Sequence, residues 1–179
     1  MDTKGNLYGI ASKGGIGYGT VYRFSPDGTF TVLYSFMGGT TDGCFPSGIP
    51  MLGKQALYGT TESCGSSGAG VVWSVSEVGK DAILHNFTGG TSDGATPYAG
   101  VIMDSAGNLY GTTSAGGASG FGTVYELSAS GTLTLLHSFA GSDGEAPYGG
   151  VIRETNGTFF GTAETAGTGG AGTVWEVKP

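Results

Sequence analysis

Short apolar runs separated by glycine and small polar residues recur along the whole chain. Within residues 107–139, the runs LYGTT, GTVYELS and TLTLLHSF are punctuated by Gly, Ser and Ala. From Leu133 to Phe139 the side chains alternate in character with a period of two, which is typical of a β-strand. The run around Val124 and Tyr125 is rich in the β-branched and aromatic residues that favour strands. The pattern therefore predicts an all-β chain.

The same pattern returns four times with a period near 50 residues. Leu-Tyr-Gly begins at residues 7, 57 and 109, and Phe-Phe-Gly takes its place at residue 159. The second strand of each unit recurs as Val-Tyr or Val-Trp, and the third ends in Phe in three units. A fourth run, at residues 48–52, 100–103 and 150–153, precedes the last three units. Four short strands in each unit of this length favour the blades of a β-propeller over a sandwich or a solenoid.

The repeats predict a single repeat domain over residues 1–179, with units at about 1–47, 48–99, 100–149 and 150–179. Residues 1–9 align with residues 103–111, so the first unit should have three strands, the next two four, and the last three. Such a chain looks like an excised or truncated piece, or a subunit of something larger. Unpaired strand edges invite pairing with another chain, so we expect a homo-oligomer, a dimer that completes one larger ring. A four-bladed monomer is the alternative.

Composition narrows the class of protein. Glycine accounts for 38 of 179 residues, but a hydrophobic fraction of 38% with nine Phe and nine Tyr argues against disorder. The glycines recur at fixed places in the repeat, where tight turns need a positive φ. The formal net charge of −7 makes nucleic acid and anionic lipid surfaces poor partners. No apolar run approaches the roughly 20 residues needed to span a membrane, so we expect no membrane insertion.

Acidic residues stand at repeated loop positions. An Asp-Gly pair, followed by proline four residues after the aspartate, precedes the first strand of three units, at Asp42, Asp93 and Asp143. Glu62 and Glu164 share one position in the loops between the second and third strands, which should emerge on the same face. One interpretation is structural, because Asp-Gly caps turns and proline stiffens the chain. The other is a ring of carboxylates that contacts a cation or sugar hydroxyls, or that hydrolyses glycosides.

The only cysteines, Cys44 and Cys64, fall in two loops of one unit that should meet on the same face. The other units have cysteine at neither place, so the pair suggests a disulfide and an oxidising compartment. Two unrelated free thiols remain the alternative. His85 and His137 share a strand position with Tyr34, which favours a structural role for all three. No nucleophile–base pair, nucleotide-binding fingerprint or metal signature occurs, so we assign no catalytic residue, cofactor or metal.

The patterns GNLYGTTSAGG, FGTVYEL and LHSFAGSDGEAPYGGV resemble those of the GloVer-type tandem-repeat proteins, also called choice-of-anchor repeat proteins. The resemblance covers nearly the whole chain, with several linked motifs in order. It implies a β-propeller-like fold and a secreted or surface-anchored bacterial setting. It supplies no activity and no catalytic residues.

Two functional hypotheses follow, beside that of a purely structural scaffold. The first is a noncatalytic extracellular module that binds glycans, with Tyr98 and Tyr148 stacking on a sugar, although both rings could equally pack in the core. The second is a hydrolase or lyase that acts on polysaccharide through loop carboxylates. We expect any ligand on the face that holds Asp42, Asp93, Asp143, Glu62, Glu164, Tyr98 and Tyr148.

Overall fold

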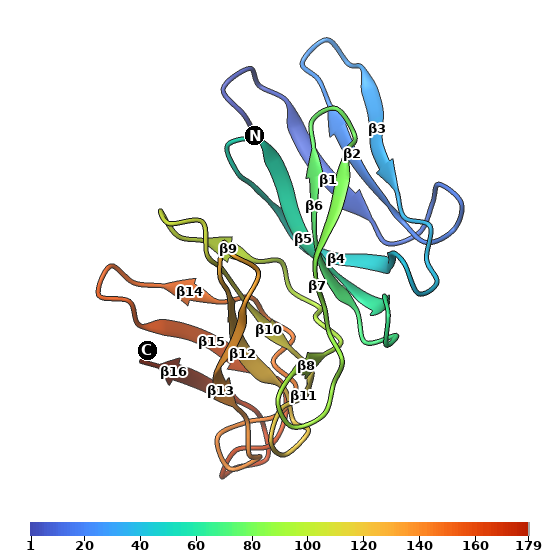
Figure 1. Cartoon of the computed structure of the whole chain (residues 1–179). Coiled ribbons are helices and arrows are strands. Elements are labelled where there is room, and N and C mark those ends of the chain that lie inside the picture. Colours follow the sequence, from blue (N-terminus) through green and yellow to red (C-terminus); the bar gives the residue numbers. More distant parts are fainter. Residues whose placement is uncertain (179) are drawn as a thin grey trace.

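Residues 1–178 are described by a computed structural model, and they form strands and no helix (Figure 1). The first sheet holds β1 (Leu7–Ala11), β2 (Thr20–Phe24) and β3 (Phe30–Ser35). The second holds β4 (Gly43–Leu52), β5 (Ala56–Cys64), β6 (Val71–Ser76) and β7 (Asp81–Asn86). The third holds β9 (Ile102–Met103), β10 (Leu109–Thr113), β12 (Thr123–Leu127) and β13 (Leu133–Ser138). The fourth holds β14 (Ile152–Arg153), β15 (Phe159–Ala163) and β16 (Thr173–Val177).

Each sheet is antiparallel and corresponds to one repeat, so the expected allotment of three, four, four and three strands is confirmed. A small extra pair, β8 (Gly94–Ala95) with β11 (Ala115–Gly116), joins two loops of the third repeat. In the second repeat the corresponding segments are the ends of the long strands β4 and β5. The all-β prediction is therefore confirmed.

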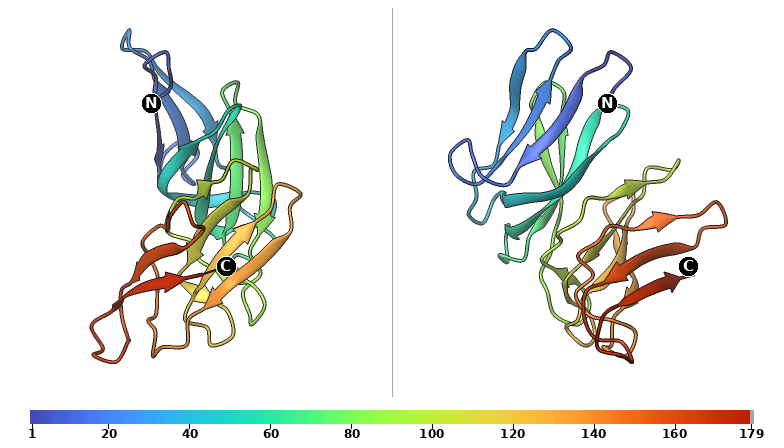
Figure 2. Two further views of the ribbon diagram at one scale, coloured as in Figure 1. Left: turned by 90° about the vertical axis from the view of Figure 1, so that its left-hand side faces the viewer. Right: turned by 180° about the vertical axis from the view of Figure 1, so that it is seen from behind.

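The four sheets stack face to face in sequence order, like a fan (Figures 1 and 2). One apolar cluster lies between each pair of neighbouring sheets: Val21 with Leu57, Val72 with Leu109, and Val124 with Phe159 belong to three successive clusters. The first sheet, blue, and the fourth, orange to red, lie at opposite ends of the series in every view. No closed ring is formed within residues 1–178, so the chain shows stacked repeat sheets but not a complete propeller.

The glycine of each Leu-Tyr-Gly motif makes room for an aromatic ring. Gly59 lies opposite Trp73 in the β5–β6 register, and a Cβ on Gly59 would stand 2.4 Å from the indole ring. Gly111 meets Tyr125 in the same way, with 2.6 Å between the added Cβ and the hydroxyl oxygen. Because real Cβ atoms do not approach so closely, the repeated glycine is a packing requirement of the neighbouring strand.

We call residues 47–49, 97–102 and 148–151, which lead into or form the first strand of the last three repeats, the innermost segments. Those of the second and third repeats lie in direct backbone contact. A Cβ on Gly48 would stand 2.0 Å from the backbone nitrogen of Gly100, so glycine is required at this crossing. The Ser47 hydroxyl donates a hydrogen bond of 3.1 Å to the Pro97 carbonyl. The buried Thr60 hydroxyl donates another, of 2.7 Å, to the Ala99 carbonyl. These bonds hold the first strand of the third repeat against the second repeat and fix the backbone near Tyr98.

Candidate functional site

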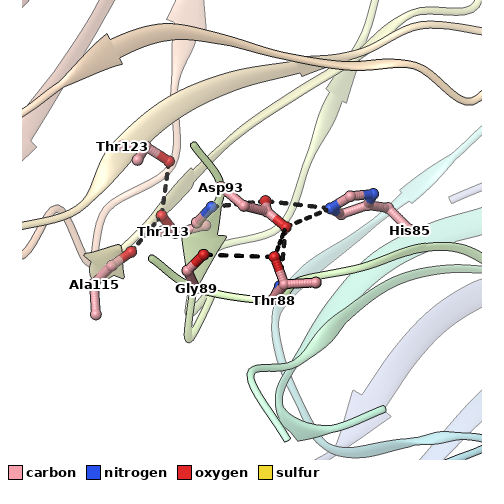
Figure 3. Close-up of polar contacts among 8 residues, drawn as sticks. His85, Thr88, Gly89, Asp93, Thr113, Ala115 and Thr123 are labelled. Atoms are coloured by element: carbon pink, nitrogen blue, oxygen red, sulfur yellow. Dashed lines mark hydrogen bonds and ion pairs between the residues drawn. The ribbon is translucent and has the colours of Figure 1, made fainter. Parts of the chain in front are cut away.

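The predicted site residues divide into two groups, and the aspartates form the first. Figure 3 shows the Asp93 carboxylate between His85 and Thr88. Its Oδ2 atom accepts hydrogen bonds from the backbone N–H and the hydroxyl of Thr88, at 2.9 and 2.8 Å, and Oδ1 accepts one from the Gly94 N–H at 2.7 Å. The His85 Nε2 atom lies 3.3 Å from each oxygen. Asp93 is buried, and its carboxylate is committed to closing the loop.

Asp42 and Asp143 close the equivalent loops. Asp42 accepts hydrogen bonds from the Tyr34 hydroxyl at 2.8 Å and from the Met37 N–H at 2.6 Å. The His137 Nε2 atom lies 2.7 Å from Oδ2 of Asp143. Tyr34, His85 and His137 thus hold one aspartate each, which agrees with the structural role that their shared repeat position indicates. The contacts favour the turn-capping interpretation of the aspartates.

The residue before each loop proline is held in the left-handed region. Phe45, Thr96 and Ala146 have φ angles of 58°, 55° and 53°. The Thr96 N–H donates to the Ala69 carbonyl at 2.9 Å, and the other two residues make the same type of bridge to the preceding sheet. A non-glycine residue at positive φ costs of order 1–3 kcal/mol and persists only where its surroundings fix it. The loops that carry the candidate site are therefore rigidly placed.

The cysteine pair is confirmed as a disulfide. Cys44 lies in β4 and Cys64 at the end of β5, with their Cα atoms 5.2 Å apart and a separation of 20 positions in sequence. The bond ties together the two loop-side ends of the second sheet. It therefore stiffens the β4–β5 end from which the neighbouring Glu62 projects.

Tyr98 and Tyr148 form the second group, and the structure brings them together although they are 50 positions apart in sequence. Their ring centroids are 4.8 Å apart with an interplanar angle of 82°, an edge-to-face pair. They line a hollow of about 330 Å³ together with glycines and aliphatic residues from the innermost segments of three repeats. We call this the tyrosine hollow; its lining comprises Gly48, Ile49, Tyr98, Ala99, Gly100, Val101, Ile102, Tyr148, Gly150 and Val151. Tyr148 is 44% exposed.

Glu62 is the carboxylate that stands beside these rings. Its negative charge is the largest cause of a raised pKa at Tyr98, followed by burial of the phenol and by Tyr148. Glu62 also lines a neighbouring hollow of about 260 Å³ with Ser12, Lys13 and Phe45. Glu62 is therefore the carboxylate that the tyrosine hollow and the neighbouring hollow have in common: its charge acts on Tyr98, and its side chain lines the second hollow with Ser12 and Lys13.

Glu164 is not brought to this place. It is exposed, lies in the fourth repeat, and contributes to the lining of neither hollow. The seven predicted residues are therefore three turn-capping aspartates, one separate glutamate, and a grouped set of Tyr98, Tyr148 and Glu62.

Sequence reasoning missed Ile49 and Lys13. Ile49 is exposed at the edge of the tyrosine hollow, where the next repeats have Gly100 and Gly150. That departure from the repeat pattern was a usable signal, since an exposed isoleucine at a glycine position has no packing role. Lys13 carried no comparable signal, because its loop differs in sequence from the equivalent loops of the other repeats.

Residues 1–178 contain no group of three or more His, Cys, Asp or Glu side chains that could hold a metal ion. They also contain no helix whose length and apolar character would allow it to cross a membrane.

The comparisons with known proteins identify a family and no curated relative. A family model described as the Gloeobacter/Verrucomicrobia repeat matches residues 1–179, the whole of the chain. None of the curated proteins matches it. The match agrees with the resemblance that the motifs indicate.

Proposed function

We propose that this chain, which belongs to the Gloeobacter/Verrucomicrobia repeat family, is a noncatalytic module that binds glycans in the tyrosine hollow. The observation that carries the proposal is the Tyr98–Tyr148 pair. It places an exposed aromatic ring at a concave surface whose remaining walls are backbone and aliphatic side chains. An aromatic face packs against the C–H face of a pyranose ring, while the phenol hydroxyl bonds to water or to a ligand.

The polar groups around the hollow suit sugar hydroxyls. Ionised Glu62 only accepts hydrogen bonds, the Tyr98 hydroxyl donates and accepts, and Lys13, whose ammonium only donates, lines the neighbouring hollow. The ordinary pKa of a tyrosine, about 10, already leaves the Tyr98 hydroxyl protonated and able to donate at neutral pH, and the raised pKa extends this to higher pH. The glycines of the innermost segments leave the backbone uncovered, so a flat ligand can approach it closely.

The arrangement supports binding rather than glycoside hydrolysis. Hydrolysis by the usual route needs two carboxyl groups on either side of the bond that is cleaved. Glu62 is the one predicted carboxylate that accompanies the tyrosine hollow. The three aspartates cap their loops, and Glu164 lies in another repeat. A screen with chromogenic glycosides tests this assignment, and hydrolysis of any of them by the chain would contradict it.

The scaffold and the location belong to the same proposal. Radial stacking of sheets with the first strand innermost supports a propeller-type scaffold, in which ligands bind near the axis. The Cys44–Cys64 disulfide supports a secreted or cell-surface setting, because disulfides persist in oxidising compartments. An extracellular glycan is then the ligand class that both chemistry and location favour.

A glycan array identifies the ligand, and titration calorimetry with the first glycan that it returns tests the site. We expect Tyr98→Ala and Tyr148→Ala each to weaken binding by about 1–2 kcal/mol, roughly 5- to 30-fold in Kd. Tyr18→Ala is the matched control, since Tyr18 is 40% exposed but lines neither hollow. A blank array, or equal losses in all three folded variants, would refute the proposed site.

A further inference from the structure

The two ends of the series of sheets expose apolar faces that are buried at every internal junction. We propose that these faces pack on each other head to tail between two copies of the chain. The head face belongs to the first sheet and consists of Leu7, Phe24, Phe30 and Val32, all exposed. The tail face belongs to the fourth sheet and consists of Ile152, Phe160 and Val174. This inference does not depend on the glycan site.

The internal junctions show what the tail face is shaped to cover. In each of them the valine of the Val-Tyr or Val-Trp strand of one sheet shares a cluster with a residue of the Leu-Tyr-Gly or Phe-Phe-Gly motif in the next sheet. The pairs are Val21 with Leu57, Val72 with Leu109, and Val124 with Phe159. All six side chains are at least 98% buried. The same valine position therefore packs on the same position of the next sheet at all three internal junctions.

Val174 is the fourth member of the valine series and is 82% exposed. Ile152, on β14 of the same sheet, is also exposed, although its counterparts Met51 and Ile102 pack against the second and third of these clusters. Leu7 is the missing partner at the other end, since it begins the first Leu-Tyr-Gly motif and is 51% exposed. Each face thus lacks what the other presents.

A second copy is the occupant that this pattern selects. Exposed apolar patches of this type mark sites of association, and the counterpart of each face is present on the chain itself. The three internal junctions provide the template, so Val174 of one copy packs on Leu7 of the other. Because the contact is heterologous, two such junctions related by a two-fold axis close a ring of eight sheets.

The junction between copies is weaker than the internal ones for an identifiable reason. In each internal junction a phenylalanine that follows the outermost strand meets an aromatic ring of the next sheet: Phe36 with Trp73, Phe87 with Tyr125, and Phe139 with Trp175, at centroid distances of 5.6, 5.2 and 5.8 Å. The fourth sheet has three strands, and residues 1–178 supply no fourth phenylalanine of this kind. Tyr22 packs on Phe30 of its own sheet instead. Among the described residues, a junction between copies therefore lacks this aromatic contact.

Sedimentation velocity of the 179-residue chain over a micromolar concentration series tests the proposal. We expect a species of twice the 17.9 kDa monomer mass to grow with concentration. Val174→Asp and Leu7→Asp should each raise its dissociation constant by about tenfold or more, since each would bury an unpaired carboxylate. Val32→Asp is a second head-face variant in case Leu7→Asp does not fold. Val78→Asp is the matched control, because Val78 is 91% exposed in the β6–β7 turn and belongs to neither face.

A mixing experiment tests the head-to-tail arrangement itself. Val174→Asp protein retains an intact head face, and Leu7→Asp protein retains an intact tail face. Mixed together they can form one complete junction, so at a concentration where each variant alone is mostly monomeric the mixture should contain more dimer than either variant. A wild-type chain that stays monomeric throughout the series would overturn the proposal. So would a mixture that stays monomeric, or a dimer that responds to one face only.

Discussion

The second sheet is covered on both faces and the first on only one, although the two sheets share the same sequence pattern. Leu57 and Leu7 begin the same tripeptide, pair with the same neighbouring strand position, and differ in what lies across from them. Leu57 packs against the first sheet and is fully buried, whereas Leu7 has no sheet across from it in residues 1–178. Burial of a repeat position is therefore set by the neighbouring repeat, and the strand sequence only makes it possible.

The largest expected effect is the difference in stability lost when Leu57 and Leu7 are each replaced by alanine. Leu57→Ala should destabilise the chain by about 2–5 kcal/mol, because it removes apolar contacts and leaves a cavity between two sheets. Leu7→Ala should cost about 1 kcal/mol or less in the monomer, since much of its side chain already contacts water. Urea unfolding at a concentration below that of association measures both. Equal losses would show that Leu7 is as deeply buried in the monomer as Leu57, against the exposure of the head face.

Much of the fold follows from the sequence because the relevant signals are local and repeated. The period near 50 residues, the period-2 alternation and the Gly–aromatic register predict the strands and their allotment to sheets. The faces of the end sheets could not be predicted in this way. Val124 and Val174 have nearly the same sequence context, yet one is fully buried and the other 82% exposed.

The site was less predictable, for a related reason. The sequence places Tyr98 and Tyr148 at one repeat position, but their contact depends on how closely the innermost segments approach, which the glycines at 48, 100 and 150 permit. The aspartates show a different limit of the sequence. An Asp-Gly pair looks the same whether its carboxylate faces solvent or folds back on the loop, and the bonds to His85 and Thr88 decide this for Asp93.

The second and third sheets are both covered on both faces, but of the two only the second carries a disulfide. Cys44 and Cys64 link the loop-side ends of β4 and β5, where the third repeat has only the backbone pairing of β8 with β11. The double variant Cys44→Ala/Cys64→Ala should lose roughly 3 kcal/mol, the entropy-model value for a loop of this length. Thermal unfolding of the oxidised, reduced and double-variant proteins measures it. Reduction that leaves the unfolding midpoint unchanged would contradict the estimate.

The smallest expected effect concerns the loops before the third and fourth sheets, which differ in how deeply their aspartate is buried. Asp93 is buried in the first of these loops, whereas the Asp143 side chain in the second is 38% exposed. Burial alone would raise the pKa of Asp143, but the Ala140 N–H, which donates at 2.8 Å, and the His137 ring more than offset it. The pKa of Asp143 in the folded chain is therefore below its ordinary value.

A carboxyl group with a lowered pKa binds protons less readily in the folded chain than in the unfolded chain. Its contribution to stability is present above the unfolded pKa of about 3.9, and it is lost as the pH falls through the lower folded value. Asp143→Asn removes this contribution, so its deficit relative to wild type should be constant near neutral pH and should shrink below about pH 4. Urea midpoints from pH 7 to pH 2 measure the deficit. Asp27→Asn is a useful control, because Asp27 also has a lowered pKa but contacts the Thr29 N–H in the β2–β3 turn, away from both loops. A deficit for Asp143→Asn that grows as the pH falls would show that Asp143 is protonated more readily in the folded chain, and the contacts with His137 and Ala140 would then have to be weaker than their distances indicate.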